Sequence, residues 1–272
     1  MAEYERRSAA EPAPIVSSTL LERPPTTTTD EKRLTITSSS LIRHSPGHPM
    51  SANQALEYPP HPFAESLTLI LAGIPPGFSD LALTGTLSTR TILLLDQISS
   101  WAALTSKPRR SANLSQRDLF LISTGSVESA KSAVAILFAL PPIATGPTLE
   151  HCLCLVLCLS IRGARHKARP ARSYVRLWTD FVACARLLAA RYLTRAEEHC
   201  LIWMTFLTGY GSESRAWEGQ IEGLLDLLVQ RYSDRVGREW EDWEGVLRDF
   251  WWLEPLGSDW CRLWERSMVR LG

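Results

Sequence analysis

The sequence predicts an all-α fold, an irregular multi-helix array that follows a disordered N-terminal segment. Apolar residues recur at spacings of three and four along most of the chain after residue 62. Clusters of Gly, Pro and Ser separate these stretches, and no run of alternating β-branched residues is bounded by hairpin turns. No repeat of fixed period is visible, so we do not expect a regular solenoid.

Residues 1–62 are expected to be disordered. They contain a Thr run at 26–29, a Ser run at 38–40, scattered prolines and few aromatic residues. A segment of this composition cannot bury enough apolar surface to offset the entropy lost on folding. The helical domain is therefore expected to span residues 63–272.

The first half of this domain shows a short apolar piece and two helix faces. The apolar piece, residues 67–71, ends at Gly73 and is followed by a turn at 74–77. One helix face is formed by Ile92, Leu95, Ile98 and Trp101. The other, which ends at a pair of prolines, is formed by Val127, Ala130, Val134, Leu137 and Phe138.

The middle of the chain predicts a buried helix between two amphipathic ones. Residues 149–160 are apolar on nearly every side, which suits a central helix. Thr194 and Glu197 form a capping box for a helix that ends at Gly209. The long amphipathic helix between them carries Tyr174, Leu177, Trp178, Phe181, Ala185 and Leu188.

Three more helices follow, and they are rich in tryptophan. Six of the ten tryptophans lie between Trp240 and Trp264. We interpret them mainly as core, with an aromatic-lined pocket for a partner or ligand as the alternative. The three faces are formed by Ile221, Leu224, Leu225 and Leu228; by Trp240, Trp243, Leu247, Phe250 and Trp251; and by Trp260, Leu263, Trp264 and Met268.

Charge and hydropathy exclude several classes of protein. The chain has 29 basic and 29 acidic side chains, whereas dedicated nucleic-acid binders carry a basic excess. The N-terminus resembles neither a secretory signal nor a mitochondrial presequence. The longest apolar stretch, residues 149–161, is shorter than the roughly 20 residues that span a bilayer. We expect an intracellular protein that does not contact a membrane.

The only local Cys/His cluster is formed by His151, Cys152, Cys154 and Cys158. Its spacings of two and four on a helix do not match the C-x2-C pairs of zinc sites, and no second pair follows. All six cysteines are expected to be reduced, and those of this cluster to be small core residues. No metal ligand is assigned.

Sequence motifs for catalysis and nucleotide binding are absent. There is no G-x-S-x-G elbow, and the glycines around Tyr210 lack the Lys-Ser/Thr of a phosphate-binding loop. We therefore assign no catalytic residue and no cofactor, and predict that the chain is not an enzyme. If it were one, His151, Cys152 and His199 would be the residues to test.

Two basic stretches remain. Residues 162–176 hold six arginines and lysines, which we interpret as a solvated loop rather than a surface for nucleic acid or an acidic partner. Residues 107–110, KPRR, are similar to a nuclear import signal but too short to assign.

Three segments carry a resemblance to a known family. They are residues 69–83 (LILAGIPPGFSDLAL), 195–203 (RAEEHCLIW) and 249–256 (DFWWLEPL), followed by the tryptophan pattern at 260–264. Together they resemble the C-terminal part of the fungal-specific transcription factor domain, the helical regulatory region that follows a binuclear zinc cluster. The match spans about residues 64–270. It implies an all-helical domain in the nucleus that responds to effectors or protein co-regulators.

The zinc cluster itself is missing from this sequence. The first cysteine is Cys152, and no C-x2-C occurs. We predict a transcription-regulatory protein, as a homo- or hetero-oligomer or alone, that contacts protein co-regulators or an effector and has no DNA-binding domain of its own. One alternative is a truncated gene model whose zinc cluster lies upstream. Another is a helical small-molecule-binding protein or enzyme, unrelated to transcription, in the cytoplasm.

Overall fold

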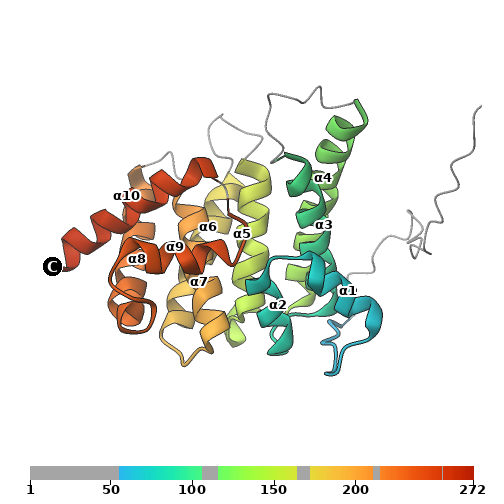
Figure 1. Cartoon of the computed structure of the whole chain (residues 1–272), viewed down its shortest axis with the longest axis horizontal. Coiled ribbons are helices and arrows are strands. Elements are labelled where there is room, and N and C mark those ends of the chain that lie inside the picture. The colour runs from blue at the N-terminus through green and yellow to red at the C-terminus, as the bar shows by residue number, and fades with distance from the viewer. Residues whose placement is uncertain (1–54, 106–115, 164–171, 211–214, 253) are drawn as a thin grey trace, which may run out of the picture. The chain divides into compact units, whose positions relative to one another are not determined.

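The computed structural model describes residues 55–105, 116–163, 172–210, 215–252 and 254–272. Within these ranges the chain forms ten α-helices and one short 3-10 turn, η1 (Ile143–Thr145), and no β-strand (Figure 1). The predicted all-α fold is therefore confirmed. The α-helices are α1 (Glu65–Gly73), α2 (Pro76–Leu83), α3 (Thr89–Thr105), α4 (Gln116–Ala139), α5 (Leu149–Gly163), α6 (Arg172–Ala189), α7 (Arg195–Tyr210), α8 (Arg215–Val236), α9 (Trp240–Arg248) and α10 (Glu254–Leu271).

The helices pack first on their sequence neighbours and then on distant ones. From α3 to α6 each helix contacts the next along the chain. Helix α7 then packs against α2 and α5 as well as against α8, α9 and α10 (Figure 1). The second half of the domain is thereby joined to its first helices through α7.

Helix α5 is the central helix that its composition predicts. Every residue from 149 to 159 is buried, and the helix contacts α4, α6 and α7. Because neighbours cover all of its sides, an apolar surface around the whole helix is favourable. The cysteines predicted as core residues, Cys152, Cys154 and Cys158, lie here and are fully buried.

The start of α7 is set by the predicted capping box. The amide and hydroxyl of Thr194 donate to Glu197 Oε2 at 2.8 and 2.9 Å, and the Glu197 amide donates back to the Thr194 hydroxyl at 3.4 Å. These bonds satisfy donors that the first helical turn leaves without partners. Helix α7 continues to Tyr210, one residue beyond the predicted end.

Helix α2 begins inside the segment predicted to be a turn. Pro76 is its first residue, where proline fits because its fixed φ is helical and no amide donor is required. The turn therefore ends at Pro75. This early start places Phe78 on the buried side of α2, where it is fully inaccessible to solvent.

The prediction of which side of α4 faces the core was wrong. Phe138 is 77% exposed, and the other four residues of that face are only half-buried. The buried stripe lies one residue earlier, which corresponds to a rotation of about 100°. The helix turns this way because it packs against both α3 and α5. The stripe comprises Ser129, Ala133, Ile136 and the adjoining Leu140.

The tryptophan-rich end forms core, as predicted, but its helix boundaries differ. Helix α9 ends at Arg248, so Phe250 and Trp251 lie in the connection to α10 rather than on α9. Trp243 and Trp260 are fully buried. The half-buried tryptophans that pack against the core are Trp240, Trp251, Trp252 and Trp264.

A buried carboxylate joins three parts of the chain. Glu150, in the first turn of α5, is fully buried. It accepts hydrogen bonds from the amide and hydroxyl of Ser88, at 3.0 and 2.6 Å, and from the Thr91 hydroxyl at the start of α3. The Tyr58 hydroxyl donates to its other oxygen at 2.8 Å. Burying a carboxylate is tolerable here because several donors replace its water.

Candidate functional site

The three segments that carry the family resemblance meet at one junction. Helix α2 contributes Phe78, α7 contributes Trp203, and the connection between α9 and α10 contributes Phe250 and Trp251. The Gly77 amide donates a hydrogen bond to the backbone carbonyl of Asp249 at 2.8 Å. Residues that lie far apart in the sequence are thus in direct contact. We refer to these four aromatic residues as the aromatic junction.

The rings of the aromatic junction pack in both edge-to-face and stacked arrangements. Phe78 lies 5.2 Å from Trp203 and 5.0 Å from Phe250, both in edge-to-face geometry. Trp203 stacks on Phe250 at 5.4 Å with an interplanar angle of 22°. Such pairs contribute about 0.5–1.5 kcal/mol each beyond the area that they bury. The junction therefore stabilises the contact of α7 with both α2 and the connection before α10.

Hydrogen bonds fix the orientation of the indoles. Trp203 Nε1 donates to the Trp251 carbonyl at 3.3 Å, and Trp251 Nε1 donates to the Ser99 hydroxyl on α3 at 3.0 Å. A Cβ atom added to Gly77 would lie 2.5 Å from Cζ of Phe250. The centre of the junction is therefore filled by protein, and a ligand or partner would meet its rim.

His199 lies on that rim, one turn before Trp203 on α7. Burial lowers its pKa below the ordinary 6.5, the charge of Arg195 lowers it further, and Asp249 and Asp80 oppose both effects. Arg195 Nε lies 3.5 Å from Nε2 of His199. The low pKa favours a neutral imidazole in the folded protein at neutral pH. His199 is the one predicted test residue that the structure places near the aromatic junction.

His151 and Cys152 occupy structural positions on α5. The His151 ring lies 2.8 Å from the Pro141 carbonyl and 2.8 Å from the Thr148 hydroxyl, so both nitrogens are engaged at the entry to α5. Burial raises the pKa of the Cys152 thiol well above 9.0. A thiolate is the reactive form of cysteine, so this environment disfavours Cys152 as a nucleophile.

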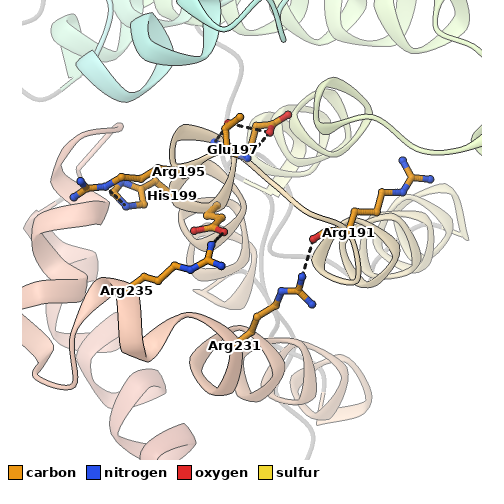
Figure 2. Close-up of polar contacts among 8 residues, drawn as sticks. Arg191, Arg195, Glu197, His199, Arg231 and Arg235 are labelled. Atoms are coloured by element: carbon orange, nitrogen blue, oxygen red, sulfur yellow. Dashed lines mark hydrogen bonds and ion pairs between the residues drawn. The ribbon is translucent and has the colours of Figure 1, made fainter.

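A group of arginines surrounds the first turn of α7, and sequence analysis did not single it out. Figure 2 shows Arg191 and Arg195 on either side of that turn and Arg231 and Arg235 on α8. All four are exposed. Arg231 Nη2 donates to the Arg191 carbonyl at 2.8 Å, and Arg235 pairs with the buried carboxylate of Glu198 (Figure 2). Arg231 and Arg235 lie four residues apart on α8, a spacing that could have indicated a shared face, whereas Arg191 lies in the connection between α6 and α7.

The basic stretches found in the sequence lie largely outside the described residues. These include residues 107–110 and 164–171. Arg176, the last arginine of the second stretch, lies on α6 and approaches Asp180 at 3.8 Å. The structure thus adds no support for a nucleic-acid surface there.

The residues that the structure describes form neither a metal-binding cluster nor a membrane-spanning helix. No group of three or more His, Cys, Asp or Glu side chains among them could hold a metal ion. None of the helices in the described part of the chain has the length and apolar character needed to cross a membrane. No protein-family model, curated protein or solved structure matches the chain.

Proposed function

We propose that this chain is a transcription-regulatory domain that acts through contacts with other proteins, of the kind found after the zinc cluster of fungal regulators. The observation that carries the proposal is the aromatic junction. The three sequence segments that resemble that family are separate in the chain, yet their residues Phe78, Trp203 and Phe250 pack on one another. Segments that define a common fold are expected to pack against one another.

The absence of a zinc-cluster motif from the sequence adds a second part to the proposal. The first cysteine, Cys152, is buried in α5 and has no C-x2-C partner. Regulation would then depend on partner proteins or an effector, and DNA would be reached through a partner. The chain would act in the nucleus, which a fluorescent fusion viewed in fungal cells would test; exclusion from the nucleus would contradict this part.

The main experiment tethers the full chain to an unrelated DNA-binding domain in yeast and measures a reporter gene. We expect reporter expression to differ from that given by the DNA-binding domain alone. Phe78→Ala removes a fully buried ring at a cost of about 3–5 kcal/mol and should abolish the effect. Leu83→Ala, on the same helix but 53% exposed, should preserve it.

Two results would overturn the proposal. One is a folded fusion that leaves both an activatable and a repressible reporter unchanged. The other is tight, sequence-selective DNA binding by the purified chain in a gel-shift assay at physiological salt, because the chain would then contain its own DNA reader. Transcripts that encode an upstream zinc cluster in frame would contradict the proposal that the protein lacks its own DNA reader. They would leave the proposed regulatory role of this domain unchanged.

A further inference from the structure

A groove of about 410 Å³ lies beside the C-terminal end of α6. Its lining includes the buried side chains of Leu188 and Leu193 and the more exposed rings of Tyr58 and Tyr192. Tyr192 is 88% exposed, so its ring is available for contact with a partner. We call this feature the Arg191 groove, because Arg191 also lines it. An apolar floor with exposed aromatic rims suits the side chain of a bound peptide.

The guanidinium group of Arg191 is held in place at this groove. Its Nη1 donates to the Pro147 carbonyl at 3.0 Å. Its Nη2 lies 3.1 Å from where a Cβ atom of Gly146 would be, so the group rests against that glycine. An arginine that is already fixed loses less entropy when it binds a carboxylate. Arg191 as a whole is exposed, so a partner can reach its side chain.

A second arginine contacts the backbone of Arg191. Arg231 reaches from α8 to the Arg191 carbonyl (Figure 2). Among the described residues, no carboxylate lies within ion-pair distance of Arg191 or Arg231. The nearby Glu197 is engaged in capping α7, and Glu198 is engaged by Arg235. Arg191 and Arg231 can therefore pair with carboxylates supplied by another molecule.

We propose that the Arg191 groove, with Arg191 and Arg231, binds an acidic peptide segment of a partner protein. An aliphatic or aromatic side chain of the peptide would enter the groove, and its carboxylates would pair with the two guanidinium groups. This inference deepens the proposed function by naming the class of partner. It rests on that function only in taking the partner to be a protein.

Charge and shape favour a peptide over a nucleic acid here. The groove combines an apolar floor with the guanidinium group of Arg191, and the carboxylate of Glu197, which also lines it, accepts hydrogen bonds from Thr194. A phosphate backbone has no apolar side chain to place in the groove and gains little from its apolar floor. A peptide that alternates acidic and apolar residues matches both features.

Binding can be measured directly on the full chain by fluorescence anisotropy. The probe is a short labelled peptide of Asp and Glu with one central Phe. We expect saturable binding that weakens as salt is raised, because exposed charges contribute to it. The same peptide with Asn and Gln in place of the acids should not bind, and Phe replaced by Ala should weaken binding.

Charge reversal locates the surface. Arg191→Glu combined with Arg231→Glu should weaken binding by at least about tenfold. The matched control is Arg176→Glu combined with Arg262→Glu, which makes the same change in charge at side chains that are 86% and 69% exposed. It should leave binding unchanged.

Several outcomes would overturn the inference. They are no peptide binding by the folded wild-type chain, equal weakening by the control variant, and equal or tighter binding of single-stranded DNA at the same site. Self-association abolished by Arg191→Glu and Arg231→Glu would assign the surface to a second copy instead. Because the reporter is not used here, peptide binding without a reporter effect would support this surface and refute the proposed function.

Discussion

The backbone of Gly77 lies against the ring of Phe250, so closely that a Cβ atom at residue 77 would come within 2.5 Å of Cζ. The same peptide unit donates its amide hydrogen bond to Asp249. A glycine at this position therefore allows α2 to approach the connection between α9 and α10. The contact makes the aromatic junction sensitive to the addition of a single methyl group.

Gly77→Ala is expected to lower the free energy of unfolding by about 1–3 kcal/mol, because the buried ring must move. Gly245→Ala and Gly219→Ala are matched controls, since a Cβ at either helical position meets nothing within 4 Å. Both should raise stability by up to about 1 kcal/mol, as alanine favours helix more than glycine. Urea unfolding followed by circular dichroism measures all three. A neutral or stabilising Gly77→Ala would contradict the packing described for α2.

Glu150→Gln is expected to cost about 1–3 kcal/mol. The carboxylate accepts from Ser88, Thr91 and Tyr58, and a glutamine amide can offer only one oxygen to these donors. The control is Glu128→Gln, whose side chain is 52% exposed and forms only an exposed pair with Lys131. That change should stay within about 0.5 kcal/mol. Equal unfolding midpoints for the two variants would show that the buried network contributes nothing.

The low pKa of His199 predicts a loss of stability in mild acid. Below pH 6.5, His199 takes up a proton in the unfolded chain, whereas in the folded protein it stays neutral. The free energy of unfolding therefore decreases as the pH is lowered from 6.5 to the folded pKa. At pH above 6.5 both states are neutral and the effect vanishes. His199→Gln should remove this component, so that the stability difference between variant and wild type shifts in favour of the variant as pH falls from 7.5 to about 5. A pH-independent difference would contradict it.

Asp226 predicts a second loss of stability in acid, at lower pH than the one predicted for His199. Burial alone would raise its pKa, but hydrogen bonds from Arg270 and Ser267 lower it below 3.8. The stability that it contributes is present above pH 3.8 and is lost as pH falls through the lower folded pKa. Asp226→Asn should therefore cost about 1 kcal/mol at pH 7 and progressively less in strong acid.

The control for Asp226 is an aspartate in a looser ion pair. Asp234 is 86% exposed and lies 3.7 Å from Arg238. Asp234→Asn should leave the unfolding midpoint unchanged at every pH. If Asp226→Asn had the same small effect at pH 7, the network between α8 and α10 would not stabilise the fold.

Features set by local pattern could be predicted from the sequence. The buried helix at 149–160 follows from its apolar surface, and the start of α7 follows from Thr194 and Glu197. The rotation of α4 could not be predicted, because apolar residues occur on more than one side and only its packing against α3 and α5 selects between them. Phe250 and Trp251 kept helical spacing in the sequence, but their contacts with α2 and α7 hold them outside α9.

The candidate sites depend on residues that are distant in sequence. Glu150 is explained only by Ser88 and Tyr58, which no spacing rule connects to it. The Arg191 groove likewise joins residue 58, the turn before α5 and the end of α6. The resemblance rests on three separate segments and does not predict that their aromatic rings share one junction.

The hydrogen bonds of residues 57 and 58 also have a mechanical consequence. The Thr89 amide donates to the Glu57 carbonyl at 2.8 Å, and Tyr58 holds Glu150. Tension applied to the chain at residue 55 would therefore load the starts of α3 and α5 before it reached α1. A partner that pulled on the N-terminal side of this domain would act on its central helix rather than on its first one.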